Sequence, residues 1–468
     1  MADITSELAR FAASAEWDDL PDSIIHDTKL MLMDHIGCAL GAHSTKRGRM
    51  SAALAENLGG TGDASVIGGE DKVSCDHAVY ANGELMITLD YSQIVAGGHD
   101  GVYIIPTPLA FAERTGASGK ELILAIAVAH EISARLGRAL GKNAITSEAV
   151  RQRQEREHPG PTGNAYSNFG AAAGAGRLLD MTDEKMLNAL GLSGHMTQIL
   201  QYTRWAHTDN SYMAKYGTPG WQQTGAVKSA LLADMGYTGD STLLDDPEHG
   251  FTYISGFNYW DPDEITSDLG DEWIFNIRMH FKPYPCCGFF HSALDCFYSL
   301  LDEHQLEPEE IDHVTAYLQE EWQDFPSEGI AGLQFDPSHA FAAAVHDIPR
   351  GPLWYDPETL TDPAIERFKD KVTTAAYPGY AEELERDPLC APGKVEVEAR
   401  GRTFSAERQY RRGTNGGEAM LTDTELADKF RRNAEFAIPQ QQTDRAIDLL
   451  MNLEDVDNVR TLMQEVTL

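Results

Sequence analysis

The sequence predicts a mainly α protein, in which a large all-helical domain carries a smaller α+β lid domain. Apolar residues recur at helical spacing through the first two thirds of the 468-residue chain. After about residue 275 this pattern gives way to segments that alternate between apolar and polar residues, as strands do. Helical periodicity then returns near the C-terminus. We therefore expect the helical domain to comprise 1–279 and 413–468, and the lid domain to comprise 280–412.

The first part of the chain contains clear helix signals. Ser118 and Glu121 form a capping box ahead of a long apolar stripe, which predicts a core helix over 118–140. The segment 164–181 is rich in glycine and alanine, so its helix has low intrinsic propensity and must be held by close packing. Thr182 is a suitable N-cap for the helix that follows.

The later part of the chain contains the strand signals. The segments 313–322 and 394–410 alternate as strands do, and the second is expected to fold back around 400–402 as a hairpin. Two segments, 421–437 and 442–456, then return to helical periodicity. We expect these last helices to pack back on the first domain.

The charge of the chain limits its partners and its environment. The formal net charge is −36, from 73 acidic and 37 basic residues that are spread along the chain. This excludes nucleic acids and anionic membranes as expected partners. A dispersed acidic surface is typical of proteins from a salt-rich cytoplasm, where high ionic strength screens self-repulsion. We therefore expect a halophilic protein.

The N-terminal segment and the cysteines point to the cytoplasm. The first thirty residues have neither a basic start nor an apolar core, as an export signal would. The six cysteines form no CxxC pair and have no zinc-like histidine partners, so we expect reduced thiols. No apolar run is long enough to predict a membrane span.

The common catalytic motifs are absent from the sequence. There is no P-loop, no dinucleotide fingerprint, no HExxH and no GxSxG. The glycine-rich stretch 59–69 lacks the P-loop lysine and spacing, and is expected to be a turn between a helix and a strand. The cysteine spacing of an iron–sulfur site is also missing. We expect no cofactor and no metal, so that any catalysis uses side chains alone.

Two polar segments of the helical part could carry a site. In LDYSQIVAGGHDG (89–101), Asp90 and His99 stand in a polar loop between long apolar segments, although an ordinary surface loop would look similar. His158 precedes a glycine-rich helix start whose free N–H groups could receive a carboxylate, although a solvated histidine is the simpler interpretation.

Two further segments combine cations with aromatic residues. Arg204, His207 and Lys215 lie in an aromatic-rich stretch, where a lysine can also simply extend to solvent. Lys282 and His291 frame the rigid turn KPYPCCGFFH at the expected domain boundary. Clefts between domains are common ligand sites.

Taken together, these segments resemble the MmgE/PrpD family, which includes 2-methylcitrate dehydratase, cis-aconitate decarboxylase and iminodisuccinate epimerase. The resemblance covers nearly the whole chain, and the order and spacing of its motifs make it specific. The motifs are YANGELMITLDY (80–91), PTPLAFAERTGASGKELILAIAVAHEISARLGRAL (106–140), FGAAAGAGRLL (169–179), KYGTPGWQQTGAVKSALLADMGYTG (215–239), KPYPCCGFFHSALD (282–295) and LADKFRRNA (426–434).

The resemblance implies a cofactor-free enzyme with a helical domain and a smaller lid. It also implies a homodimer that acts on small di- or tricarboxylates. The catalytic positions that it implies are Asp90, His99, Lys215, Lys282 and His158. For substrate binding we assign Arg204, His291 and Tyr284.

The chain departs from the family pattern at three places. The stretch from Asp90 to His99 is about one residue shorter than in the decarboxylases. Ser92, Gln93 and Ile94 stand where relatives commonly have two acids and a threonine. His158 lies about three residues further from Gly170 than the corresponding histidine of relatives. These departures affect residues around the expected pocket.

The residues leave three functions open. Elimination of water needs a base, an acid for the departing hydroxyl and cations for the carboxylates, and His99, Lys215, Lys282 and Arg204 suit these tasks. Our first hypothesis is a lyase of the 2-methylcitrate dehydratase type. The alternative is epimerisation or decarboxylation, which needs no acid for a hydroxyl and fits the lost acids. A carboxylate-binding protein without catalysis is the third.

Overall fold

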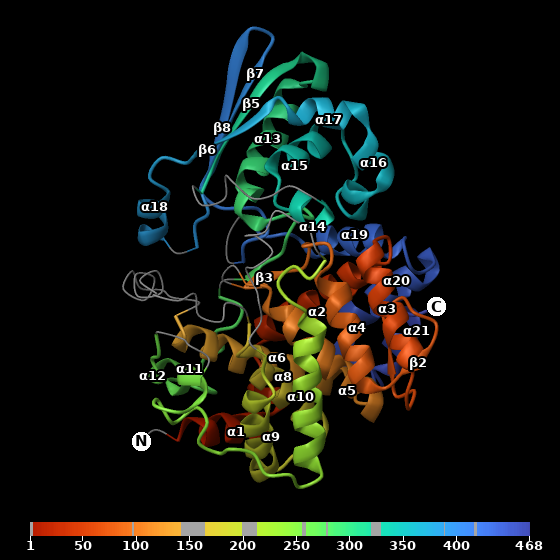
Figure 1. Ribbon diagram of the computed structural model, residues 1–468, viewed down its shortest axis with the longest axis vertical. Coiled ribbons are helices and arrows are strands. Elements are labelled where there is room, and N and C mark those ends of the chain that lie inside the picture. The colour runs from red at the N-terminus through yellow and green to blue at the C-terminus, as the bar shows by residue number, and fades with distance from the viewer. Residues whose placement is uncertain are drawn as a thin grey trace.

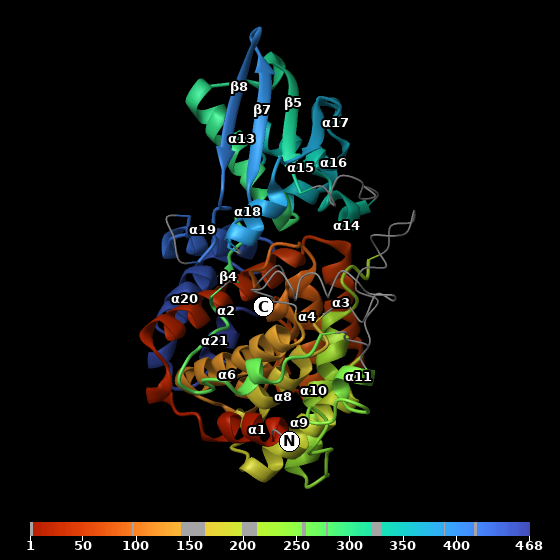
Figure 2. The ribbon, with the colours of Figure 1, turned by 90° about the vertical axis from the view of Figure 1, so that its left-hand side faces the viewer.

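The protein is mainly helical, with a smaller part that contains the main sheet. The computed structural model describes residues 3–95, 98–141, 164–198, 213–254, 259–277, 279–319, 329–387, 389–415 and 419–468. Figures 1 and 2 show a broad helical body, with a narrower part above it that combines strands and helices. The predicted fold class is confirmed, and the chain boundaries of the two expected domains stay a prediction.

The helical body is formed by the first half of the chain. Its longer helices are α1 (Ile4–Ser14), α2 (Asp22–Ala42), α3 (Lys46–Leu58), α4 (Cys75–Ile87), α5 (Pro106–Thr115), α6 (Gly119–Ala139), α8 (Ser167–Leu178), α9 (Asp183–His195) and α10 (Pro219–Asp234). Short elements join them: β1 (Ala64–Ser65), β2 (Lys72–Val73), β3 (Ile94–Val95), η2 (Asp100–Tyr103), α11 (Phe251–Ile254) and α12 (Asp263–Thr266).

The predicted start of the core helix is confirmed at atomic detail. Ser118 Oγ accepts a hydrogen bond from the Glu121 N–H at 3.3 Å, and Glu121 Oε2 accepts one from the Ser118 N–H at 2.7 Å. This capping box satisfies N–H groups that the first turn of α6 cannot pair internally. Thr182 likewise accepts from the Lys185 N–H at 3.4 Å and caps α9.

Glycines allow the central helices to pack closely, as the composition of 164–181 predicts. A Cβ on Gly170 of α8 would lie 2.1 Å from the Ala129 carbonyl oxygen and 2.2 Å from Ser133 Oγ, both on α6. A Cβ on Gly220 of α10 would lie 2.0 Å from the Tyr80 carbonyl oxygen of α4. Glycine is therefore required at these contacts for the helices to approach this closely.

The upper part contains a four-stranded sheet of order β6–β5–β7–β8. The predicted hairpin is confirmed: β7 (Gly393–Ala399) and β8 (Arg402–Arg408) pair antiparallel, and both turn residues, Arg400 and Gly401, have positive φ. β5 (Ile311–Leu318) begins two residues before the expected strand. Its parallel neighbour β6 (Val372–Ala376) was not expected from the sequence.

Helices support this sheet and connect it to the body. α13 (His291–His304) packs against β7 and β8, and α15 (Pro337–Val345) packs against α13 and α17. The remaining elements of this part are β4 (Met279–His280), η4 (Gly288–Phe290), α14 (Gly329–Leu333), α16 (Pro357–Thr361), α17 (Pro363–Lys369) and α18 (Tyr380–Arg386).

The chain returns to the helical body at its C-terminal end, as the sequence predicts. The last helices are α19 (Asp423–Ala434), α20 (Gln440–Met451) and α21 (Arg460–Glu465). α19 and α20 pack against α2, and α21 packs against α20 and α5. Figure 2 shows these helices beside the first helices of the chain, below the sheet.

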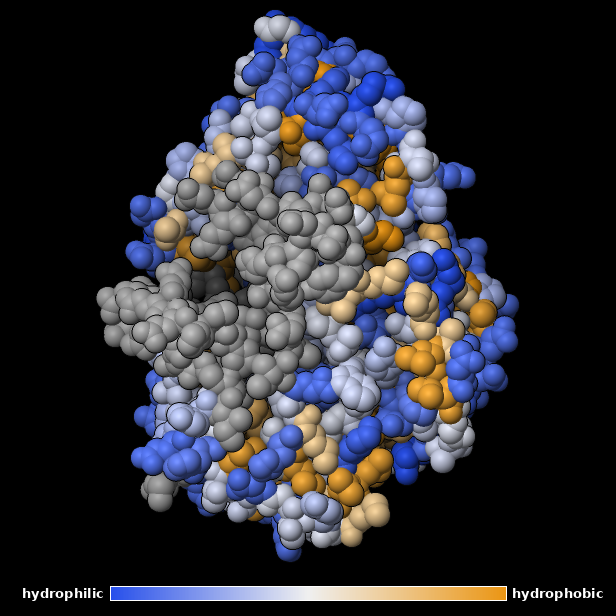
Figure 3. Space-filling model, in the orientation of Figure 1, coloured by the Kyte–Doolittle hydropathy of each residue, from blue (hydrophilic) through white to orange (hydrophobic). Residues whose placement is uncertain are grey.

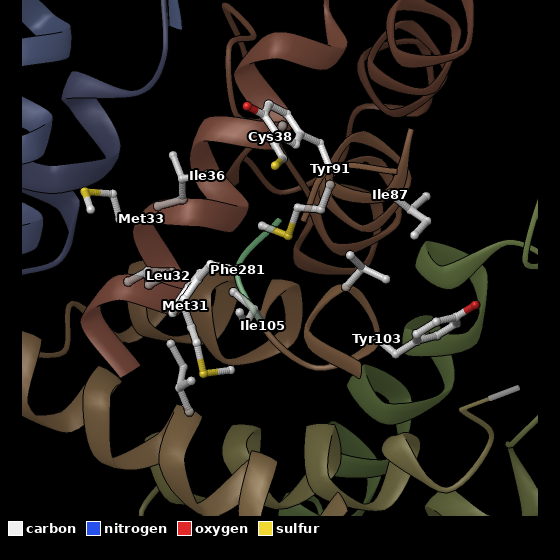
Figure 4. Close-up of a cluster of buried hydrophobic side chains, with 14 of the residues drawn as sticks. Met31, Leu32, Met33, Ile36, Cys38, Ile87, Tyr91, Tyr103, Ile105 and Phe281 are labelled. Atoms are coloured by element: carbon white, nitrogen blue, oxygen red, sulfur yellow. The ribbon is translucent and has the colours of Figure 1, made fainter. Parts of the chain in front are cut away.

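A hydrophobic core lies around α2. Figure 4 shows that side chains from α2, from the end of α4 and from three later segments meet there. Tyr91, which directly follows Asp90 in the polar loop, belongs to this cluster and is fully buried. The labelled members are Met31, Leu32, Met33, Ile36, Cys38, Ile87, Tyr91, Tyr103, Ile105 and Phe281.

The surface and the cysteines agree with parts of the sequence analysis. All six cysteines are buried free thiols, as expected. Within the described ranges, no helix is both long enough and apolar enough to cross a membrane. Figure 3 shows a face that is largely hydrophilic, with hydrophobic residues gathered in places over the helical body. Met50, Leu54 and Leu58 are exposed at four-residue spacing on α3.

We predict that Gly170→Ala destabilises the protein by roughly 1–3 kcal/mol, because the new methyl group overlaps backbone and side chain of α6. Gly174→Ala is the matched control on the same helix, since its nearest contact would be 3.0 Å. Denaturant unfolding of both variants measures the difference. Equal midpoints for the two variants would contradict the role of Gly170 in helix packing.

Candidate active site

Asp90 lies at the centre of the candidate site, just after α4. Its side chain is completely buried, and its backbone has a φ of +51°. A non-glycine residue in this left-handed region is uncommon and costs conformational energy. The Asp90 N–H donates to the Ile87 carbonyl at 3.1 Å, so the conformation is part of the turn that ends the helix. The turn directs the carboxylate into the interior.

Three of the predicted residues surround this carboxylate. Asp90 Oδ1 lies 3.1 Å from Lys215 Nζ and 3.2 Å from His99 Nε2, and Oδ2 lies 2.8 Å from Lys282 Nζ. Lys282 Nζ also donates to the Asp90 carbonyl at 2.8 Å. Burial alone would raise the pKa of Asp90, but the two lysines and His99 hold it well below its usual value. Asp90 is therefore ionised at neutral pH.

Lys215 stands in a left-handed turn just before α10. The following residues, Tyr216 and Gly217, have φ values of +61° and +78°. Lys215 Nζ donates to Gln334 Oε1, and Gln334 Nε2 in turn donates to the Thr88 carbonyl at 2.9 Å. Burial lowers the pKa of Lys215 to about 8, although the Asp90 carboxylate opposes this shift. The ammonium can therefore lose a proton close to neutral pH.

His99 presents a neutral imidazole to the site. Burial and the nearby Lys282 lower the pKa of His99 to about 4, although Asp90 opposes the shift. Because Nε2 faces a carboxylate oxygen, we assign the single ring proton to Nε2. Nδ1 is buried and has no hydrogen-bond partner among the described residues, so its lone pair can accept a hydrogen bond there. The His99 ring packs 4.9 Å from the Tyr216 ring, between centroids.

A second buried ion pair, which the sequence analysis missed, supports the first. Lys429 of α19 donates to Asp34 Oδ1 of α2 at 2.7 Å, to the Tyr91 carbonyl at 2.6 Å and to the Lys282 carbonyl at 3.0 Å. Asp34 Oδ2 accepts from the Gln93 N–H at 2.7 Å. One lysine thus fixes the backbone beside both Asp90 and Lys282. Its motif, LADKFRRNA, is among those that carry the family resemblance.

The loop that holds Asp90 is also fixed by a short strand pair. β3 pairs antiparallel with β4, with Ile94 opposite His280. Lys282 follows β4 by two residues. The polar loop and the KPYP turn are therefore joined by backbone hydrogen bonds as well as by the Asp90–Lys282 contact.

Two of the residues predicted to bind substrate, Tyr284 and His291, form hydrogen bonds within the protein. The Tyr284 hydroxyl donates to Asp295 Oδ1 at 2.8 Å, and its ring stacks on Tyr298. His291 Nε2 lies 3.1 Å from the Cys286 carbonyl, and its Nδ1 lies 3.4 Å from a ring nitrogen of His280. Neither side chain contacts Asp90 in these interactions, and the assignment of both to substrate binding stays a prediction.

The other two predicted residues, His158 and Arg204, lie outside the described residues. Their roles stay predictions.

The positions that depart from the family pattern contribute unsatisfied polar atoms. Ser92 Oγ and both side-chain polar atoms of Gln93 are buried, and no described residue forms a hydrogen bond with them. Such groups are rare in protein interiors and call for a bound water or another partner. This chain therefore has polar residues at two of the three positions, Ser92 and Gln93, and an apolar residue, Ile94, at the third.

The cluster has the charge and chemistry for an anionic substrate. Two ammonium groups oppose one carboxylate and a neutral imidazole, so its net charge is positive within a strongly acidic protein. Cations in a buried site can stabilise the charge that develops on a carboxylate-bearing carbon. Among the described residues, no group of three histidine, cysteine or acidic side chains is arranged to hold a metal ion.

Comparison with known proteins identifies the family. The model of the MmgE/PrpD N-terminal domain matches residues 6–261, and that of the C-terminal domain matches residues 284–455. The chain is 23% identical to a cis-aconitate decarboxylase of Aspergillus terreus, over 98% of this chain and 95% of the relative. It is 22% identical to human cis-aconitate decarboxylase, over 98% of this chain and 93% of the relative.

A cis-aconitate decarboxylase-like protein of Aspergillus oryzae is similar to the same degree, with 23% identity over 98% of this chain and 96% of the relative. These relatives and both family models span the helical body and the part with the main sheet. The chain belongs to the MmgE/PrpD family.

Proposed function

We propose that this protein is a lyase that decarboxylates a small unsaturated tricarboxylate of the cis-aconitate type, using side chains alone. The observation that carries the proposal is the buried Asp90 carboxylate, which holds two ammonium groups and a neutral imidazole in one cluster. The relatives named cis-aconitate decarboxylase, which match nearly the whole chain, favour this reaction over the others.

The reaction needs one proton and a place for developing charge. As the carbon–carbon bond to the departing carboxylate breaks, its electron pair forms a new double bond, and the old double bond moves its pair to the neighbouring carbon. That carbon takes a proton, and carbon dioxide leaves. Lys215 is the proton donor that we propose, because its pKa of about 8 leaves it protonated yet acidic near neutral pH.

The remaining groups hold the substrate and orient the donor. Asp90 keeps the Lys215 ammonium in place, and Gln334 holds it from another side. Lys282 offers positive charge to a substrate carboxylate while it stays anchored on Asp90. The neutral His99 imidazole offers Nδ1 as a hydrogen-bond acceptor to water or substrate, and its pKa of about 4 makes it a weak base.

Dehydration of the 2-methylcitrate type is the second candidate. A protonated Lys215 could release its proton to a departing hydroxyl, and His99 Nδ1 could remove the proton from the adjacent carbon. This was the first hypothesis from the sequence. The named relatives favour decarboxylation only weakly at 22–23% identity. Epimerisation, which needs only proton removal and return, fits the same groups.

Decarboxylation can be tested directly on a panel of substrates. We expect cis-aconitate incubated with the protein in deuterated water to give carbon dioxide and a shifted alkene that carries one deuterium, read by NMR. Citrate and 2-methylcitrate should stay unchanged. Alkene formation from 2-methylcitrate would instead support dehydration, inversion of a chiral aspartate derivative would support epimerisation, and binding without turnover would leave a carboxylate-binding protein.

Lys215 variants connect that turnover to the site. Lys215→Ala should lower kcat/KM by at least about 100-fold, because it removes the proposed proton donor. Lys228→Ala is the control, since Lys228 is an exposed lysine of α10 that pairs with Asp76. A Lys215→Ala variant that folds and keeps near-normal turnover would exclude Lys215 from the chemistry.

The pH dependence follows from the two shifted groups. Lys215 is protonated below a pKa of about 8, so kcat/KM should fall as pH rises above about 8. His99 is neutral above a pKa of about 4, so kcat/KM should stay level through pH 6.5, where an ordinary histidine titrates. Initial rates from pH 5 to 10 measure both. A step near pH 6.5, or a flat profile up to pH 10, would contradict this assignment.

We also propose that the protein is a cytoplasmic homodimer adapted to high salt. The adaptation to salt is supported by the net charge of −36 and the acidic residues spread along the chain, whereas the homodimer is what the family resemblance implies. Because salt screens repulsion between surface carboxylates, the melting temperature should rise when KCl is increased to about 2 M. A melting temperature that does not depend on salt would remove this support, and light scattering would give the oligomeric state.

A further inference from the structure

Arg411 is a cation that the proposed reaction has not used. It lies in the segment that leads from β8 back to the helical body. The segment is held directly after Arg411: the Arg412 N–H donates to Asp295 Oδ2 at 2.9 Å, and the Phe281 N–H donates to the Gly413 carbonyl at 2.9 Å. Phe281 directly precedes Lys282. The backbone thus places Arg411 beside the proposed active site.

Arg411 is half-buried, and among the described residues its guanidinium has no anionic partner. Its only hydrogen bond among the described residues runs from Nη1 to the Gly288 carbonyl at 3.2 Å, and its Nε is buried without a partner. The neighbouring arginines are paired, Arg408 with Asp295 and Arg412 with Glu425. Burial lowers the pKa of Arg411, and no carboxylate of the described residues offsets this. An unpaired charge in such a place is costly unless a ligand supplies its counter-ion.

The side chains of Arg411 and Lys282 come close to each other at Gly288. The position that a Cβ of Gly288 would occupy lies 3.1 Å from Arg411 Nη1, 3.7 Å from Lys282 Cε and 3.4 Å from Ile94 Cδ1. Glycine at this position lets the guanidinium come this close, because even a Cβ there would be tightly packed against Arg411 Nη1. The Arg411 guanidinium, the Lys282 side chain and the Ile94 methyl group therefore meet at Gly288.

Arg411 brings the charge of the site closer to that of the proposed substrate. Asp90 neutralises one of the two lysine ammonium groups, which leaves one net positive charge for a substrate with three carboxylates. Arg411 adds a second positive charge. Proton donation by Lys215 and loss of one carboxylate as carbon dioxide then lower the charge of the site and the charge of the ligand by one each.

We propose that Arg411 binds one carboxylate of the substrate beside Lys282 and thereby selects for ligands that carry this carboxylate. The proposal rests on the proposed function, because it assumes a polycarboxylate substrate. A guanidinium suits the task, since its planar donors match both oxygens of a carboxylate. The bound carboxylate supplies the anion that Arg411 lacks.

Binding to unreactive ligands tests the proposal without turnover. Propane-1,2,3-tricarboxylate has no double bond and no hydroxyl group. Pentanedioate is the same skeleton without its middle carboxylate, and 2-methylbutanedioate lacks one terminal carboxylate. Titration calorimetry should show that Arg411→Gln weakens binding of the tricarboxylate by about 10- to 100-fold, the range for a lost charged hydrogen bond. Binding of the diacid that keeps the carboxylate bound by Arg411 should weaken similarly. Binding of the other diacid, which lacks that carboxylate, should change little.

The unequal losses separate recognition from a structural role. If Arg411 only held the Gly288 turn through its carbonyl, Arg411→Gln would weaken all three ligands alike, and this result would overturn the proposal. Unchanged binding of the tricarboxylate would overturn it too. Arg412→Gln, at the adjacent and acid-paired position, is the control and should bind all three as the unaltered protein does.

The same titrations separate this proposal from the proposed reaction. If the unaltered protein binds the tricarboxylate through Arg411 but turns over no member of the substrate panel, the reaction is wrong and the carboxylate site stands. If it converts cis-aconitate and Arg411→Gln binds every ligand normally, the reaction stands and the Arg411 site is wrong. If the unaltered protein binds none of the three ligands, the Arg411 site is overturned.

Discussion

The buried Asp90 carboxylate is the interaction on which the rest of the site depends. A carboxylate without solvent is costly unless cations and hydrogen bonds surround it, and Asp90 contacts two lysines and a histidine. These partners come from segments far apart in the chain, before α10 and after β4. The removal of one of them would leave uncompensated charge in the interior. Asp90 therefore stabilises the fold and determines the charge of the site at the same time.

The second ion pair explains why the last helices return to the body. Lys429 of α19 reaches Asp34 of α2, and it also donates to the carbonyls of Tyr91 and Lys282. Tyr91 directly follows Asp90, and Lys282 is the lysine closest to the Asp90 carboxylate. An element near the C-terminus thus fixes the backbone on both sides of the Asp90–Lys282 contact. The geometry of the site depends on the whole chain, which is consistent with family matches over both parts.

The sequence predicts features whose signals are local, and misses those that arise from distant contacts. The α6 capping box and the hairpin turn at Arg400 are determined by residues a few positions apart. β6 is short, only partly buried and paired in parallel with β5 from across several helices, so its own residues predict little. Asp90 and Lys215 could be proposed from polarity and family resemblance together.

The supporting residues of the site could not be found in the same way. Gln334 and Lys429 look like ordinary polar residues until the fold brings them to Lys215 and to Asp34. Tyr284 stands in a proline-set turn that suggests a site, but its hydroxyl is bound by Asp295. A pattern of residue types indicates which side chains could act. Only the hydrogen bonds of the folded chain show which of them are already occupied.

The placement of the cations resolves an apparent conflict between the protein and its proposed substrate. A chain with a net charge of −36 repels polycarboxylates at long range, and salt screens this repulsion within about 10 Å or less. Inside the site, few ions and little water separate the groups, so each cation acts at full strength over a short distance. Lys215, Lys282 and Arg411 are buried or border the buried space, whereas the acidic excess is spread over the chain. High salt would then weaken the unfavourable surface field and leave the favourable contacts of the site largely intact, so the acidic composition and an anionic substrate are compatible.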